Sequence, residues 1–231
     1  MYNKSEIYAV IPARSGSKRI KNKNLLKFKG KSLIEYSIIS AIKSQSFLRK
    51  NIILSSDDKN LKKYSEKYNI TFHLRKKTFA RDKTTMQTTL KNIIKECNIS
   101  IDNILVLLQP TSPLRSDNII NKSIKLLSKD KKSTSIISVM KESLFFGTII
   151  KKKYWKPHFN STMRTQDIKI YSPSGSIFAY KIKKSIMTKK ELGNYPLAII
   201  EDEKFLLNID TPEDYRSLNQ KYLIYRNRKK T

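Results

Sequence analysis

Residues 7–24 read IYAVIPARSGSKRIKNKN and contain the main indications of the fold. Ile7 to Ala13 form a nearly continuous apolar run, which is typical of a strand buried on both faces of a parallel sheet. Arg14 to Asn24 follow as a polar loop that carries five cations around small residues. A buried strand that ends in such a loop predicts that the loop lies at the carboxyl edge of a sheet, where open α/β sheets bind ligands.

Apolar runs and helical patterns alternate along most of the remaining chain. Further strands are predicted at residues 51–54, 71–74, 103–108, 134–139, 175–180 and 205–209, and helices at 32–42, 60–68, 85–97, 118–127 and 182–190. A last helix is expected after Thr211, because a threonine cap, a proline and two acidic residues mark a helix start. This alternation predicts an α/β protein with a doubly wound, mostly parallel sheet.

The alternation stops between Met140 and Tyr171. This segment is polar and irregular, and it places Trp155 and Phe159 near consecutive lysines. We expect a single domain over residues 1–231 in which residues 140–171 form an inserted arm.

The chain is strongly basic, with 48 Lys and Arg against 19 Asp and Glu and a formal net charge of +29. An anionic partner is therefore worth considering: nucleic acid, a membrane surface or a phosphorylated small molecule. The cations are 38 lysines and only 10 arginines, scattered along the whole chain. Nucleic-acid binders use arginine heavily, so the pattern favours genomic composition over a nucleic-acid footprint.

Cysteine and hydropathy patterns narrow the class further. The single Cys97 excludes an intrachain disulfide and a cysteine-based zinc site, and two histidines argue against a histidine-rich metal site. No apolar run approaches the ~18–20 residues needed to span a bilayer. The N-terminal apolar run is too short for a signal peptide, so we expect a cytoplasmic protein without membrane association.

Three polar segments join the basic loop as candidate parts of a site. Gln109 to Arg115 (QPTSPLR) follow a predicted strand and are stiffened by two prolines. Residues 208–210 end another predicted strand. An aspartate at a strand end can hold Mg²⁺, but it is more often a turn or cap residue. Arg164 to Asp167 lie beyond the irregular segment. The basic loop matches neither a P-loop nor a G-x-G-x-x-G motif. From the pattern alone, two interpretations stay open: a phosphate-binding loop or a solvated connection between a strand and a helix.

Together these segments resemble the acylneuraminate cytidylyltransferase family, also called CMP-sialic acid synthetases. Ile11 to Lys18 (IPARSGSK), continuing to Lys23 and Asn24, are similar to the family's nucleotide loop. Gln109 to Arg115 match a second and very specific family motif, and Ile209 to Asp214 (IDTPED) are similar to its metal motif. The resemblance covers essentially the whole chain.

The resemblance implies a fold and a reaction. The fold is a Rossmann-like nucleotidyltransferase fold, and residues 140–171 would be a dimerisation arm that reaches the partner's site in a homodimer. In the reaction, CTP and a nine-carbon 2-keto sugar acid give the CMP-sugar and pyrophosphate. The sugar's anomeric hydroxyl attacks the α-phosphate in line, which asks mostly for positioning and charge neutralisation.

The resemblance also implies site residues. The set expected to bind nucleotide is Ala13, Arg14, Ser15, Lys23, Asn24, Arg75 and Gln109. The set expected to bind the sugar is Gln109, Arg164, Gln166, Ser174 and Gly175, with Arg164 suited to the sugar carboxylate. Asp210, with Asn208, would hold Mg²⁺ or Mn²⁺. The residues expected to act in catalysis are Arg14, Lys23 and Asp210.

Two departures from the family pattern affect what can be expected. Asn208 stands where relatives commonly have a second aspartate, which removes one negative charge from the metal motif. Residues 174–178 read SGSIF where many relatives have Asn-Gly-Ala-Ile-Tyr, so the sugar stays open among sialic, legionaminic and pseudaminic types. The alternatives are a cytidylyltransferase for another keto-acid sugar, such as a KDO-type acid, and a catalytically inactive basic relative with a binding role.

Overall fold

A seven-stranded sheet in the order β11-β7-β10-β6-β1-β4-β5 forms the centre of the protein. The computed structural model describes residues 2–116, 118–142, 147–151, 154–158, 164, 170–201 and 208–228. The strands are β1 (Ile7–Pro12), β4 (Ile52–Ser56), β5 (Thr71–Leu74), β6 (Ile104–Leu107), β7 (Ser135–Glu142), β10 (Ile170–Lys181) and β11 (Pro196–Ile200). Only β10 runs antiparallel to its neighbours within this sheet, so the predicted, mostly parallel sheet is confirmed.

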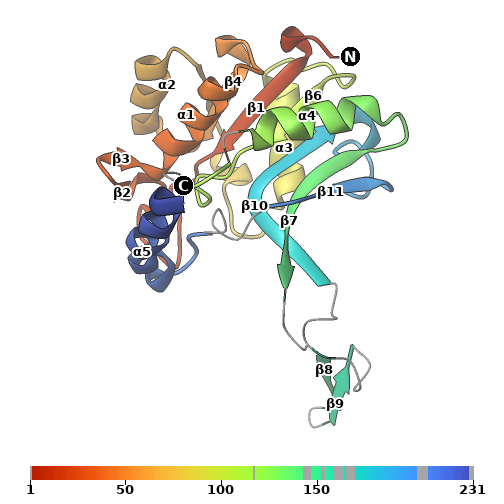
Figure 1. The fold of residues 1–231 in the computed structure, drawn as a ribbon. Coiled ribbons are helices and arrows are strands. Elements are labelled where there is room, and N and C mark those ends of the chain that lie inside the picture. Colours follow the sequence, from red (N-terminus) through yellow and green to blue (C-terminus); the bar gives the residue numbers. More distant parts are fainter. Residues whose placement is uncertain are drawn as a thin grey trace.

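Helices cover both faces of the sheet, which confirms the doubly wound prediction (Figure 1). Ala9 and Ile11 of β1 face the apolar side chains of α1 (Leu33–Ser44), α2 (Lys62–Tyr68) and α4 (Ile119–Lys129). Val10 points to the other face, where α3 (Met86–Glu96) packs. All three β1 side chains are fully buried, because alternate residues of a strand point to opposite faces and both faces are covered here.

The helix starts follow their capping residues. Ser32 caps α1, with its backbone N–H donating to the Glu35 carboxylate and its hydroxyl accepting from the Glu35 N–H. Thr211 precedes α5 (Pro212–Arg228) and accepts from the N–H of Asp214, whose carboxylate accepts from the Thr211 N–H at 2.8 Å. The predicted start of the last helix is therefore confirmed.

Some predicted elements differ from the structure. Residues 182–190 form only a 3₁₀ turn (Ile182–Lys184) followed by turns, because Ser185 and Thr188 hydroxyls bond to nearby carbonyls and compete with helical bonding. The edge strand β11 and a small hairpin of β2 (Lys27–Phe28) and β3 (Lys31–Ser32) were not predicted. Of the strand expected at 205–209, residues 205–207 lie outside the described residues.

The inserted segment is more regular than its sequence indicates. β7 and β10 run beyond the rest of the sheet, and β8 (Gly147–Ile150) pairs with β9 (Tyr154–Pro157) in a hairpin that stands away from the body (Figure 1). In the hairpin, Ile149 lies opposite Trp155. Phe159 falls outside the described residues. The predicted arm therefore contains a two-stranded hairpin.

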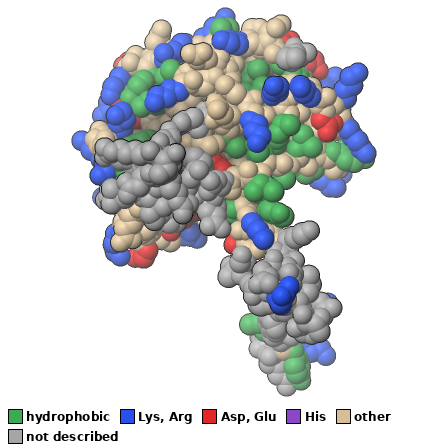
Figure 2. Space-filling view, in the orientation of Figure 1, with side chains coloured by type: hydrophobic (Ala, Val, Ile, Leu, Met, Phe, Trp, Pro, Cys, Tyr) green, Lys and Arg blue, Asp and Glu red, His purple; other side chains and the backbone are tan. Residues whose placement is uncertain are grey.

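The surface agrees with the scattered charge of the sequence. Among the residues coloured in Figure 2, lysine and arginine side chains lie in several separate groups rather than in one stripe. Among the helices that the structure describes, none combines the length and apolar character needed to cross a bilayer.

Candidate active site

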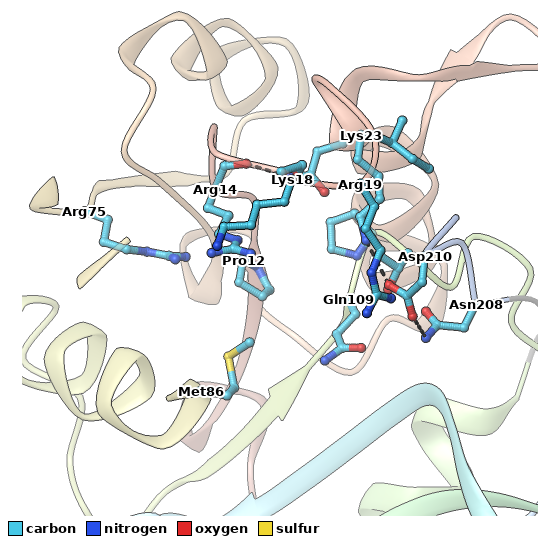
Figure 3. Close-up of a pocket in the computed structure, with 15 residues that line it drawn as sticks. Pro12, Arg14, Lys18, Arg19, Lys23, Arg75, Met86, Gln109, Asn208 and Asp210 are labelled. Carbon is cyan, nitrogen blue, oxygen red and sulfur yellow. Dashed lines mark hydrogen bonds and ion pairs between the residues drawn. The ribbon is translucent and has the colours of Figure 1, made fainter. Parts of the chain in front are cut away.

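A cavity of about 540 Å³ opens at the carboxyl ends of β1 and β6 (Figure 3). It brings together three of the four polar segments that the sequence singled out, namely the loop after β1, the turn after β6 and residues 208–210 before α5. Its lining includes five cations, Arg14, Lys18, Arg19, Lys23 and Arg75. One carboxylate, that of Asp210, lines it. This excess of positive charge suits a polyanionic ligand.

Hydrogen bonds at both ends hold the basic loop in place. Ser15 donates to the Asp57 carboxylate through its N–H at 2.9 Å and its hydroxyl at 2.6 Å. Burial would raise the pKa of Asp57, but these bonds outweigh it and lower the pKa. Asn24 donates to the Arg14 carbonyl at 3.0 Å. Ser15 therefore faces Asp57. Neither Ser15 nor the buried Ala13 is among the residues that line the cavity, although the resemblance implied that both bind nucleotide.

Carboxylates pair with most of the cavity's cations. Asp82 accepts from Arg14 at 2.7 Å and from Lys18 at 2.8 Å, and these two bonds lower the pKa of its carboxyl. Lys23 pairs with Asp210 at 2.9 Å. The Arg14 and Asp82 side chains are 39% and 44% exposed, and an ion pair in such surroundings is weak. Phosphate oxygens can therefore replace the Asp82 carboxylate at little cost.

Arg75 is a buried cation at the cavity wall, 5% exposed. Its Nε donates to the Ser55 hydroxyl at 3.2 Å, and its Nη2 donates to the Ser55 carbonyl at 3.0 Å. Burial lowers the pKa of Arg75 to about 10, so the guanidinium stays charged at neutral pH. The structure thus places Arg75 in the wall of the cavity that the basic loop also lines, and its expected contact with a nucleotide stays a prediction.

Gln109 lines the cavity, and Arg115 fixes the turn on which it lies. Arg115 donates to the Ser37 hydroxyl of α1 at 3.0 Å, to the Ser176 carbonyl of β10 at 2.7 Å and to the Gln109 carbonyl. Burial lowers the pKa of this guanidinium to about 10. The sequence marked Arg115 only as part of a motif, and its bracing role was missed.

Asp210 lies between an ammonium and an amide. Lys23 Nζ donates to its Oδ1 at 2.9 Å, and Asn208 Nδ2 donates to its Oδ2 at 2.7 Å. The Ile209 N–H donates to the Thr111 carbonyl at 2.8 Å, which fixes this segment against the turn after β6. The three residues expected to act in catalysis, Arg14, Lys23 and Asp210, line the same cavity, and their catalytic role stays a prediction.

The donor set around Asp210 is suited to one kind of metal site. In the described part of the chain, no group of three or more His, Cys, Asp or Glu side chains could hold a metal ion. Asp210 and Asn208 offer a carboxylate and an amide oxygen, which are hard donors. They fit a magnesium ion that keeps most of its ligands from water and substrate phosphates, as Mg²⁺ usually does.

The residues expected around the sugar are only partly placed. Gly175 adopts φ +79°, and a Cβ there would lie 3.0 Å from the Ser112 hydroxyl, so the bulge in β10 requires glycine. Ser174 is buried and donates to Glu201 at 2.9 Å. Neither residue lines the cavity, nor does the exposed Arg164. Gln166 lies outside the described residues.

Glu201 is a buried carboxyl that the sequence analysis did not single out. It is 4% exposed, and burial raises its pKa. It lies at the end of β11, a strand that the sequence did not predict, so no pattern pointed to it.

Comparisons with known proteins identify the family of this chain. The family model described as "Cytidylyltransferase" matches residues 8–228. The chain is 31% identical over 227 residues to an N-acylneuraminate cytidylyltransferase of Escherichia coli, covering 92% of this chain and 51% of that protein. It is 30% identical over 242 residues to a CMP-N,N'-diacetyllegionaminic acid synthase of Legionella pneumophila, covering 94% and 99%.

The match in length differs between these relatives. The chain spans about half the length of the first curated relatives it matches, at 51% of each. Among solved structures, CMP:2-keto-3-deoxy-manno-octonic acid synthetase complexed with CTP is similar with a TM-score of 0.69 at 14% identity. That likeness covers 96% of this chain and 100% of the other, and it is a likeness of fold.

Proposed function

Because the chain belongs to the cytidylyltransferase family, we propose that it transfers the cytidylyl group of CTP to a nine-carbon 2-keto sugar acid and releases pyrophosphate. The observation that carries this proposal is the cavity itself, in which five cations and one carboxylate meet at the carboxyl edge of the sheet. Relatives named for neuraminate and legionaminate support the class of sugar acid. The acyl pattern of the sugar stays open.

The chain's own residues would act mainly through charge and position. Arg14 and Lys18 would exchange the Asp82 carboxylate for phosphate oxygens of CTP, and Lys23 lies within reach of the same space. The oxygen of the sugar hydroxyl forms a new bond to the α-phosphorus and its proton passes to solvent. The bond between the α-phosphorus and the oxygen that bridges to the β-phosphorus breaks, and this oxygen leaves with pyrophosphate. Fixed cations stabilise the charge that develops on the leaving pyrophosphate.

We further propose that the reaction uses Mg²⁺, or Mn²⁺ in its place. Asp210 and Asn208 would hold the ion together with phosphate oxygens. When bound, it supplies charge neutralisation at the phosphates.

A homodimer is part of the same proposal. On the β8–β9 hairpin, the side chains of Ile149 and Tyr154 are 71% and 52% exposed. An isolated two-stranded hairpin is only marginally stable in water, and exposed apolar side chains often mark an interface. We propose that a second copy of the chain covers this arm.

Pyrophosphate release tests the proposed reaction. The protein is incubated with CTP, Mg²⁺ or Mn²⁺, and each of four acids of neuraminic, legionaminic, pseudaminic and KDO type. We expect release with at least one nine-carbon acid. Release with the KDO-type acid alone would favour that alternative, and no release with any acid would overturn the proposal in favour of an inactive relative.

Variants of the cavity locate the activity. We expect Arg14→Ala and Asp210→Ala each to lower turnover by about 100-fold or more, because each removes a charged group next to the reacting phosphates. Arg216→Ala is the control, since Arg216 is 73% exposed on α5 and pairs with the exposed Glu213. Activity that survives in both cavity variants would show that the site lies elsewhere.

A further inference from the structure

A chain of hydrogen bonds runs from the end of α3 to Arg75 in the cavity wall. The Glu96 carboxylate lies 2.8 Å from His73 Nε2, and His73 Nδ1 lies 3.0 Å from the Ser55 hydroxyl. That hydroxyl in turn lies 3.2 Å from both Nε and Nη2 of Arg75. Of these four residues, only Arg75 lines the cavity.

We assign a direction to each bond from the donors and acceptors that these groups offer. A guanidinium has only donors, so the Ser55 hydroxyl oxygen accepts from Arg75 and its single proton goes to His73 Nδ1. His73 then carries its proton on Nε2 and donates it to Glu96. The hydrogen bond from His73 is the first cause that lowers the pKa of Glu96 to about 2, so an ionised acceptor anchors the chain.

Ser55, His73 and Glu96 have the order of a nucleophile, a base and an orienting acid, but they cannot act as such a triad here. Ser55 is fully buried and does not line the cavity. Its oxygen already accepts hydrogen bonds from Arg75. A nucleophilic hydroxyl needs a free path to substrate, which this one lacks.

Arg75 is charged, buried and incompletely paired. Within the described part of the chain, it forms no ion pair, and no hydrogen bond is found from its Nη1. Asp57 raises the pKa of Arg75 only from a distance. A buried charge without a counter-ion is costly, so the site is arranged for an anion that comes from the cavity.

We propose that Ser55, His73 and Glu96 are positioning residues that hold the Arg75 guanidinium with Nη1 turned to the nucleotide. Ser55 occupies one edge of the guanidinium, and His73 keeps the Ser55 oxygen available by taking its proton. This inference rests on the proposed function, because it takes CTP as the ligand.

A double-mutant cycle with CTP binding as the readout tests the proposal. Dissociation constants are measured by calorimetry on the wild type, Arg75→Ala, His73→Phe and the double variant. His73→Phe keeps a ring, and Glu96 retains hydrogen bonds from Lys76 and Asn92. We expect Arg75→Ala to weaken binding about tenfold, through loss of a charge-assisted bond, and His73→Phe about fivefold.

The double variant decides between positioning and a general structural role. If His73 acts through Arg75, His73→Phe causes no further loss in the Arg75→Ala background. His73→Asn should restore most of the affinity, because its side-chain oxygen can accept the Ser55 proton. Losses that multiply in the double variant, or no rescue by His73→Asn, would overturn the proposal.

A matched control and a second readout complete the design. Lys76→Gln removes the ion pair between Lys76 and Glu96, at 3.1 Å, and should leave CTP affinity unchanged. Exchange of the Arg75 Nε proton, followed by NMR without nucleotide, should accelerate in Ser55→Ala and in His73→Phe. Ser55→Ala supplies the test if His73→Phe fails to fold. If the exchange rate is the same in both variants as in the wild type, the network is rejected even where CTP binds. If exchange accelerates in the variants but the wild type does not bind CTP, only the proposed function is rejected.

Discussion

At the scale of single residues, we expect the charge of the groups around Asp210 to set the affinity of this site for divalent cations. Lys23 and Asn208 each donate to one oxygen of this carboxylate. A second acid at position 208 would compete with Asp210 for the ammonium and add an oxygen donor of full charge. We therefore expect Asn208 to lower the affinity of this site for a free divalent ion.

Asn208→Asp should increase the affinity of the nucleotide-free protein for Mn²⁺ by about tenfold, because a second carboxylate adds a charged hard ligand. Electron paramagnetic resonance of free Mn²⁺ measures this affinity without any turnover. Asn194→Asp adds the same charge at an exposed position and serves as the control. Equal affinities in wild type and Asn208→Asp would refute the expectation.

At the scale of elements, Glu35 connects α1 to α2. Its carboxylate accepts from the Ser32 N–H at 2.8 Å, from Lys67 at 2.7 Å and from the Tyr68 hydroxyl at 2.9 Å. Burial would raise the pKa of Glu35, but these hydrogen bonds outweigh it and lower the pKa to about 2. A folded-state pKa below the unfolded value means that the ionised group stabilises the fold above the unfolded pKa.

Glu35→Gln should therefore lower the free energy of unfolding at pH 7 by about 1–3 kcal/mol, a range that discounts for the exposed Lys67. The difference from wild type should shrink as the pH falls from the ordinary glutamate value toward 2, where the wild-type carboxyl takes up its proton. Urea unfolding at several pH values measures it. Glu66→Gln removes an exposed pair with Lys62 and should change stability by less than about 0.5 kcal/mol. A pH-independent difference for Glu35→Gln would contradict this account.

At the scale of the whole molecule, the arm is the part that the body does not cover. The β8–β9 hairpin stands away from the sheet, and Ile149 is its most exposed large apolar side chain among those described (Figure 1). The proposed dimer would bury this residue against a second copy.

Ile149→Lys should convert a dimer to a monomer, because a lysine in an apolar interface loses its hydration without a partner. Light scattering coupled to size-exclusion chromatography gives the mass. Ile200→Lys is the control, since Ile200 is 62% exposed on β11 of the central sheet, outside the β8–β9 hairpin. A wild-type monomer, or an Ile149→Lys dimer of unchanged stability, would refute the dimer.

The basic residues that give the high net charge fall into two groups, those of the cavity and those elsewhere on the surface. Arg14, Lys23 and Arg75 line one cavity, where a polyanion would need them. Other lysines and arginines are distributed over the visible surface (Figure 2). The site thus accounts for a few of the 48 basic residues.

The sequence by itself determined the alternation of strands and helices, the doubly wound sheet and the residues that meet in the cavity. These properties are local: an apolar run such as Ile7 to Pro12 and a cap such as Thr211 act on their immediate neighbours. The motifs at 14–24, 109–115 and 208–210 could be found for the same reason, since strand ends in a parallel sheet share one edge.

Only the tertiary structure decided which strands pair and which side chains support the site. Pro196 opens β11 at the sheet edge, where a proline is tolerated and the strand needs its partner β7 to form. Arg115 and the Ser55–His73–Glu96 chain depend on bonds between residues 18 to 78 positions apart. Such contacts leave no periodic trace in the sequence, because burial and hydrogen bonding across distant segments arise only when the chain is folded.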